Sequence, residues 1–173
     1  MNTVLDPVIE AYVSYFGKTA RPIVWDVGSR DGRDAVELSE RVWEGGDGSA
    51  LSAGLVVCLE PNPSQAEIIR RSYPQVRVLE VAASDVDGVA DFIVYHGDEG
   101  AIGSSSLDLR WKEDDLEGHV IQVKTVRLDG LLDMVVDVMK IDVEGHSMPV
   151  LLGLGEKLAD IRVLHVETEE WTE

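Results

Sequence analysis

The chain has a single cysteine, Cys58, among its 173 residues, so a disulfide framework is excluded and the sequence favours a reducing, cytoplasmic location. Basic side chains are also scarce. Fifteen lysines and arginines stand against 33 aspartates and glutamates, which gives a formal net charge of −18. Because nucleic-acid affinity rests on neutralising phosphates with lysine and arginine, DNA and RNA are not expected partners.

Long hydrophobic runs are missing too. No 18 consecutive residues are apolar, and the first residues lack the basic start and apolar core of an export signal. We therefore expect neither membrane insertion nor export. The hydrophobic content of 45% is nevertheless enough to build one core, and the length suits one domain.

Periodicity predicts an alternating α/β order. Short apolar runs predict buried strands at 24–27, 55–59, 76–81, 135–143 and 161–167. Helical spacing predicts helices at 7–16, 31–43 and 63–72, and a fourth helix that Ser147 caps. The packed face of the helix at 7–16 is expected to carry Val8, Ala11, Tyr12 and Tyr15. Alternating runs at 89–95 and 120–126 are expected to pair, and the polar stretch 97–118 between them is long enough for a lid.

A glycine turn and a lone acidic residue follow the first two expected strands. Gly28 and Gly32 come directly after the strand at 24–27, and Glu60 follows the strand at 55–59. Glycine lets the backbone turn close to a ligand, and an ionised carboxylate can accept both hydroxyl hydrogens of a ribose. In an open α/β sheet this arrangement is typical of a site for an adenosine-containing cofactor.

The turn does not match a dinucleotide site. A dinucleotide fingerprint has three glycines, so that a pyrophosphate can rest on amides at a helix N-terminus. Here the middle glycine is missing, and Asp31 places negative charge where the pyrophosphate would lie, which Arg30 offsets only in part. We therefore favour S-adenosylmethionine, with Asp26 and Asp31 facing its ammonium and sulfonium region.

Three ionisable residues crowd the end of the strand at 135–143. Lys140, Asp142 and Glu144 alternate with apolar residues, so the period-two rule places the three charged side chains on one side of the strand. Open α/β sheets bind ligands at the carboxyl ends of their strands. This strand end is therefore predicted to belong to the site.

Together, these residues resemble the FkbM-type methyltransferases, S-adenosylmethionine-dependent enzymes that mostly methylate hydroxyl oxygens of small molecules and sugars. The most specific matches are LEPNP and KIDVEG; the full set is WDVGSRDG at 25–32, CLEPNP at 58–63, VAASDVDGVADF at 81–92, GSSSL at 103–107, VKTVRLDGLL at 123–132 and KIDVEG at 140–145. The resemblance implies one methyltransferase-like domain over residues 1–173, with a Rossmann-like, doubly wound, mostly parallel sheet of the class I methyltransferase type. Since the sequence ends at Glu173, the closing antiparallel strands of that family are expected to be missing from the fold or removed from the chain.

The resemblance also implies three groups of cofactor-binding residues. Those expected at the amino-acid end of the cofactor are Asp26, Gly28, Ser29, Asp31 and Gly32. Those expected at the ribose and its surroundings are Glu60, Pro61 and Asn62, and those expected beside the adenine are Ala83, Ser84 and Asp85.

Methyl transfer to oxygen requires aligned reactants and a base that takes the proton of the hydroxyl. His146 is the first choice, because the unperturbed pKa of histidine lies near neutrality, although a structural role is also compatible with a single histidine. Asp142 and Glu144 would orient it or bind Mg²⁺ or Mn²⁺, and Lys140 is expected to pair with Asp142 or to act on the substrate. Residues expected to border the acceptor are Ser104, Ser105, Ser106, Glu167 and Trp171.

Three functions remain open at this point. The favoured one is an O-methyltransferase that acts on a sugar or another hydroxylated small molecule. A cofactor-binding pseudoenzyme or regulatory module is the alternative, since Ser147 stands where the family often has glutamate. A nicotinamide or flavin oxidoreductase is disfavoured by Asp31 and the missing glycine. The sequence indicates no partner protein or oligomeric state.

Overall fold

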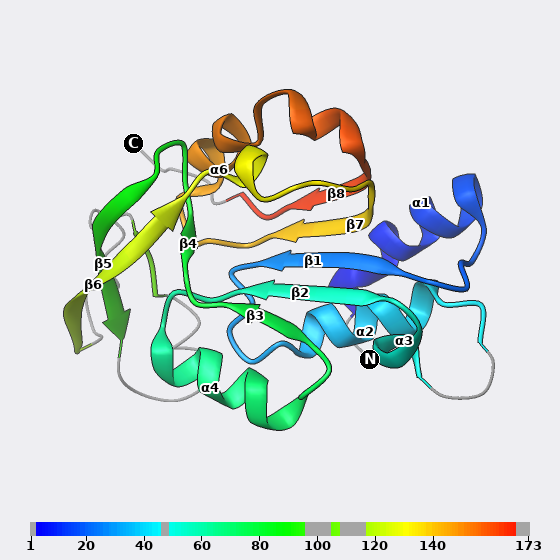
Figure 1. Ribbon diagram of the computed structural model, residues 1–173, viewed down its shortest axis with the longest axis horizontal. Coiled ribbons are helices and arrows are strands. Elements are labelled where there is room, and N and C mark those ends of the chain that lie inside the picture. Colours follow the sequence, from blue (N-terminus) through cyan, green and yellow to red (C-terminus); the bar gives the residue numbers. More distant parts are fainter. Residues whose placement is uncertain (1–2, 46–48, 96–104, 108–116, 169–173) are drawn as a thin grey trace.

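The computed structural model describes residues 3–45, 49–95, 105–107 and 117–168 (Figure 1). Its centre is a five-stranded sheet in the order β3-β2-β1-β7-β8, in which all neighbouring strands run parallel. The strands are β1 (Ile23–Val27), β2 (Leu55–Leu59), β3 (Arg77–Leu79), β7 (Val136–Ile141) and β8 (Ile161–Val166). The strand order reverses between β1 and β7, which makes that point the expected ligand crevice of a doubly wound sheet.

Helices cover both faces of this sheet, which explains why its strands are apolar almost throughout. One face packs against α1 (Asp6–Phe16), α2 (Arg33–Val42) and α4 (Pro63–Ser72). The other face packs against α6 (Ser147–Leu154) and the short 3-10 helix Leu128–Gly130. Other short helices are Thr3–Leu5, α3 (Ala50–Ala53) and Gly155–Asp160. Among the described residues, no helix combines the length and the apolar character needed to span a membrane.

A second, smaller sheet lies at the carboxyl ends of the central strands, at the left of Figure 1. It contains β4 (Ala82–Ala83), β5 (Gly88–Tyr95) and β6 (Gly118–Val126) in the order β4-β6-β5. β5 and β6 are antiparallel, which confirms the pairing predicted from their alternating sequences. Phe92, Val94 and Val123 are buried on one side of this sheet, so the small sheet has an apolar face.

Several predicted boundaries are wrong, and each has a local cause. The strand expected at 76–81 is shorter and covers only Arg77–Leu79, because pairing with β2 ends at Leu79; β4, which pairs with β6 from Ala82 on, was not predicted. The helix expected from residue 31 begins at Arg33, because Gly32 adopts a left-handed conformation with φ of 78°. Helix α3 was not predicted; it is only four residues long. The lid predicted at 97–118 lies mostly outside the described residues.

Two side chains also differ from the prediction. Ser147 is not the cap of α6 but its first residue, and its hydroxyl donates to the main-chain carbonyl of Glu167 at 2.9 Å, so a tertiary contact replaces the expected local one. Tyr15 is 82% exposed. The buried face of α1 instead follows Val8, Ile9 and Tyr12, and helical spacing turns position 15 away from it.

The amino-terminal end of the sheet is held together by one buried carboxylate. Asp137, at the start of β7, accepts hydrogen bonds from the Tyr12 hydroxyl at 2.9 Å and the Ile23 amide at 2.8 Å, and it pairs with Arg162. Burial, followed by the contact with Asp137, raises the pKa of Tyr12 to about 12. One side chain thereby connects α1 with three neighbouring strands.

We expect Tyr12→Phe to lower stability by about 2 kcal/mol, because it removes a hydrogen bond to a buried charged acceptor. In a chain of this length that corresponds to a fall in Tm of about 4–8 °C. Thermal and urea denaturation measure the effect. The matched control is Tyr15→Phe, which removes the same hydroxyl from an exposed position of the same helix. Equal stability of the two variants would contradict the role given to Asp137.

Candidate functional site

Gly28 lies where the ends of β1 and β7 come closest. A Cβ atom at this position would lie 1.8 Å from the carbonyl oxygen of Asp142, and the backbone has φ of 85°. The Asp142 amide donates to the Val27 carbonyl at 2.9 Å and holds the two segments at this separation. Only glycine satisfies both conditions, so the crevice at the switch point is bordered here by main chain alone.

The amides of the glycine turn already have acceptors. Those of Gly28 and Ser29 donate to the Leu59 carbonyl at 3.0 and 3.1 Å, and that of Gly32 donates to the Ser29 carbonyl at 2.8 Å. At the start of α2, the Arg33 amide donates to the carboxylate of Asp31 at 3.1 Å. A pyrophosphate needs such amides unpaired, so this turn is poorly suited to a dinucleotide.

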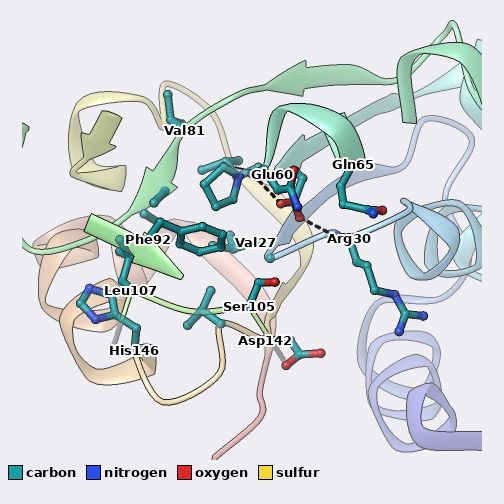
Figure 2. Close-up of a pocket in the computed structure, with 17 residues that line it drawn as sticks. Val27, Arg30, Glu60, Gln65, Val81, Phe92, Ser105, Leu107, Asp142 and His146 are labelled. Atoms are coloured by element: carbon teal, nitrogen blue, oxygen red, sulfur yellow. Dashed lines mark hydrogen bonds between the residues drawn. The ribbon is translucent and has the colours of Figure 1, made fainter. Parts of the chain in front are cut away.

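Arg30 is a site residue that the sequence analysis did not include. It adopts φ of 50°, which is uncommon for a residue with a side chain. In this conformation its amide donates to the carboxylate of Glu60 at 2.7 Å (Figure 2). Its position inside the glycine motif, between Gly28 and Gly32, was the available signal.

Glu60 follows β2 and is only 6% exposed. One carboxylate oxygen accepts from the Arg30 amide and the other from the Asn62 amide at 2.8 Å. Each oxygen keeps a second lone pair, so the oriented carboxylate can still accept two hydroxyl hydrogens. Burial raises the pKa of Glu60 to about 8, against the lowering effect of the two amides. Asn62 also accepts from the Ser64 amide at 3.0 Å, which confirms that it caps α4.

Glu60 borders a cavity between the carboxyl ends of the central strands and the small sheet. We call this cavity the apolar chamber; it holds about 560 Å³ of empty space, part of which is open to solvent. Figure 2 shows Val81, Phe92 and Leu107 on one side of it and Glu60 with Arg30 on the other. The predicted site residues that line it are Gly28, Glu60, Pro61, Asn62, Ala83, Ser105, Asp142 and His146. The apolar wall was missed, because its residues come from separate segments that only the tertiary structure brings together.

A second cavity adjoins the first and is lined mainly by polar groups. We call it the polar chamber; it shares Gly28, Arg30 and Asp142 with the apolar chamber. Its carboxylates are Asp31, Asp34, Asp142, Glu144 and Glu167, and its cations are Arg30 and Lys140. Acidic groups outnumber basic ones, so the chamber favours a cationic ligand group over an anionic one. Asp34 was not predicted.

Lys140 is a buried cation at the base of the polar chamber. Its ammonium lies 2.7 Å from the Asp142 carboxylate, 3.0 Å from that of Asp34 and 3.8 Å from that of Glu167. Burial alone would lower the pKa of Lys140, but the carboxylates of Asp26 and Asp142 hold it above its usual range. The ammonium therefore stays charged and orients Asp142, as the predicted pairing required.

Asp26 lies beside Lys140 on the neighbouring strand, in register with it. It is 1% exposed, and neither carboxylate oxygen has a hydrogen-bond partner among the described residues. The Ser29 hydroxyl donates to the main-chain carbonyl of Asp26 and not to its carboxylate. Burial raises the pKa of Asp26 to about 7, although Lys140 acts in the opposite direction. Asp26 lines neither chamber.

Three other predicted cofactor residues lie outside both linings. Gly32 keeps α2 close to α4, since a Cβ there would lie 3.1 Å from Ile69. Ser84 is buried, and its hydroxyl lies 3.1 Å from Nε2 of His146. The same hydroxyl donates to the Asp85 carboxylate at 3.2 Å. Ser84 thus contacts both His146 and Asp85.

The predicted catalytic residues are divided between the two chambers. His146, the residue preceding α6, lines the apolar chamber, whereas Glu144 and Lys140 line the polar one. Asp142 borders both. Glu144 leaves the strand pattern, because its left-handed conformation with φ of 47° turns the chain after β7. Asp142 is therefore the predicted catalytic residue that borders both chambers.

The residues expected at the acceptor are also separated. Glu167 lines the polar chamber, and Ser105 lines the apolar one. Ser106 is buried, where its main chain pairs with Ile93 and its hydroxyl donates to the carbonyl of Glu144. Ser104 and Trp171 lie outside the described residues.

A divalent ion is not supported by the geometry. In the described part of the chain, no three or more histidine, cysteine, aspartate or glutamate side chains form a group that could hold a metal ion. Asp142, which was expected to bind such an ion together with Glu144, instead contacts the ammonium of Lys140.

Comparisons with known proteins identify the family of this chain. The family model of the methyltransferase FkbM domain matches residues 26–172. The crystal structure of Methyltransferase FkbM from Methylobacillus flagellatus KT aligns with a TM-score of 0.49 and 13% identity, over 83% of this chain and 33% of that one. This chain thus spans about a third of the length of that protein. The comparison with curated proteins gave no significant match. Because the family match runs from β1 past the end of β8, the chain belongs to the methyltransferase FkbM family.

Proposed function

We propose that the protein is an S-adenosylmethionine-dependent O-methyltransferase whose acceptor is a sugar or another hydroxylated small molecule. The observation that carries this proposal is the meeting of two unlike chambers at Gly28 and Asp142. S-adenosylmethionine has a similar division, with a flat adenine ring at one end and, at the other, an amino-acid half whose sulfonium and ammonium outweigh its single carboxylate in charge. Family membership supports methyl transfer in general, and the chambers support this cofactor in particular.

Each half of the cofactor has matching groups. The apolar chamber suits the adenine, and the carboxylate of Glu60, already oriented by two amides, suits the ribose hydroxyls. The carboxylates of the polar chamber suit the sulfonium and ammonium charges. The same carboxylates would repel a phosphorylated or carboxylated acceptor, which favours a neutral hydroxylated one.

The chemistry assigned to the chain is proton removal and alignment. S-adenosylmethionine, when bound, supplies a methyl group on a positively charged sulfur. His146 takes the proton of the acceptor hydroxyl as the oxygen gains the methyl group, and the electron pair of the broken bond stays on the sulfur. Asp142, held by Lys140, helps align the two reactants where the chambers meet.

Glu60→Gln tests the ribose contact. The substitution keeps the shape, but one amide nitrogen then faces a main-chain donor, at Arg30 or at Asn62, and the charge is lost. We expect the Kd for S-adenosylmethionine to rise about 10- to 100-fold, which matches the loss of charged hydrogen bonds. Isothermal titration calorimetry with S-adenosylmethionine and S-adenosylhomocysteine measures it.

The matched control is Glu67→Gln, which neutralises a half-exposed glutamate on α4 and should leave the affinity unchanged. Equal affinities of Glu60→Gln and the unaltered protein would remove the ribose assignment. Tight binding of NAD, with no heat from S-adenosylmethionine, would instead favour an oxidoreductase.

Cofactor affinity should depend on pH through Glu60. Its pKa is raised to about 8 without ligand, whereas the ribose hydroxyls bind the ionised form, so binding near pH 7 must release a proton. Affinity is therefore expected to rise by up to about tenfold per pH unit from pH 6 to 8 and to level off above that. Calorimetry in buffers of different ionisation enthalpy counts the protons. The slope should vanish in Glu60→Gln, and a flat profile in the unaltered protein would contradict the linkage.

His146→Gln tests the assigned base. Transfer of a labelled methyl group is first screened over sugars, polyols and phenols to find an acceptor. With that acceptor, we expect kcat to fall about 100- to 10,000-fold, the usual contribution of a general base, while the Kd for the cofactor changes far less.

The control for His146→Gln is His119→Gln, which removes an exposed histidine on β6. An unchanged kcat in His146→Gln would exclude the base assignment. Binding of the cofactor with no transfer to any acceptor of the screen would favour the pseudoenzyme.

A further inference from the structure

Three side chains form a continuous hydrogen-bonded chain behind the apolar chamber. Nε2 of His146 lies 3.1 Å from the Ser84 hydroxyl, which donates to the Asp85 carboxylate at 3.2 Å. His146 lines the chamber, whereas Ser84 and Asp85 line neither chamber. Ser84 is 62 residues from His146 in the sequence, so only the tertiary fold brings the two together.

The order of donors and acceptors in this chain determines where the imidazole proton lies. An ionised carboxylate accepts hydrogen bonds and cannot donate, and a serine hydroxyl has one hydrogen. A hydrogen bond to an ionised carboxylate is stronger than one to a neutral imidazole, so the hydroxyl hydrogen is assigned to Asp85 and the Ser84 oxygen accepts from His146. A neutral His146 must then carry its proton on Nε2, which leaves the lone pair on Nδ1.

Rigid main-chain contacts hold the three residues in place. The Ser84 amide donates to the Val126 carbonyl at 2.9 Å, and the Arg127 guanidinium donates to the Asp85 carbonyl at 2.9 Å. A Cβ at Gly153 would lie 2.0 Å from the Ser84 carbonyl oxygen, so α6 packs directly on this segment. Since His146 precedes the first residue of α6, the same packing sets its distance from Ser84.

We propose that Ser84 and Asp85 are positioning residues that hold His146 in the tautomer protonated on Nε2. The relay itself rests on the described geometry, and its catalytic meaning rests on the proposed function. In that function, Nδ1 accepts the proton of the acceptor hydroxyl, and the resulting imidazolium donates from Nε2 to Ser84, next to the carboxylate of Asp85. This replaces the expectation that Ser84 and Asp85 flank the adenine.

The tautomer of His146 can be measured by NMR without any substrate. Protein labelled with ¹⁵N-histidine is studied by long-range ¹H–¹⁵N correlation at a pH where the ring is neutral, and the signals of His146 are identified by their loss in His146→Gln. We expect a protonated-type Nε2 and an unprotonated-type Nδ1 in the unaltered protein. If the unaltered protein showed two tautomers in exchange, or a proton on Nδ1 of His146, the proposal would be wrong.

Variants of Ser84 and Asp85 then test whether these residues cause the tautomer preference of His146. Ser84→Ala should give averaged nitrogen signals, Ser84→Thr should restore the single tautomer because it keeps the hydroxyl, and Asp85→Asn should weaken the preference because an amide can also donate. The matched control is Ser147→Ala, which removes another buried hydroxyl beside His146 whose acceptor is the Glu167 carbonyl. It should leave the tautomer unchanged. An unchanged tautomer in Ser84→Ala would exclude Ser84 as its cause.

Kinetics separate the relay from the proposed function. With an acceptor from the screen, Ser84→Ala should lower kcat about 10- to 100-fold, as loss of an orienting partner does, with the KM for the cofactor within about twofold. A tautomer that depends on Ser84 together with an unchanged kcat would keep the relay and reject His146 as the base. A fall in kcat together with an unchanged tautomer would reject the relay alone.

Discussion

The site depends on one steric constraint, the close approach of the carbonyl oxygen of Asp142 to Gly28. A Cβ only 1.8 Å from that oxygen is impossible, so any other residue at position 28 would push the ends of β1 and β7 apart. The approach lets the glycine turn fold back onto the end of β2, where Arg30 presents its amide to Glu60. It also makes Gly28 and Asp142 the common border of the two chambers. One missing side chain therefore keeps the glycine turn next to Glu60 and gives the two chambers a common border.

Buried ionisable groups are concentrated around the candidate site. Glu60 and Asp26 have raised pKa values because burial disfavours their ionised forms, whereas the pKa of Lys140 is raised because surrounding carboxylates outweigh its burial. Such groups are costly to bury, and they stabilise a fold less than apolar residues of similar size would. Their concentration at the carboxyl ends of β1, β2 and β7 is best explained by ligand binding, since these strand ends meet at the switch point.

The small sheet adds what the central sheet lacks. The central strands supply charged and main-chain groups at their ends. Phe92 of the small sheet contributes to the apolar wall opposite Glu60 (Figure 2), and Ala83 lines the same chamber. Because β4 continues directly into Ser84, the same sheet also brings a hydroxyl to His146. The end of one short strand thus contributes both to the lining of the apolar chamber and to the contact with His146.

The sequence by itself determined the approximate positions of the five central strands, the pairing of β5 with β6, the cap at Asn62 and the nearness of Lys140 to Asp142. These follow from periodicity, turn chemistry and local spacing. The sequence also predicted that Gly28 and Gly32 bound the glycine turn and that the carboxylate of Glu60 belongs to the site. Tertiary structure alone decided that Glu144 and His146 face different chambers, that Asp26 is buried beside Lys140, and that Ser84 contacts His146. The physical reason is that these arrangements depend on left-handed backbone turns and on strand ends brought together by packing, and neither is encoded in the spacing of any single segment.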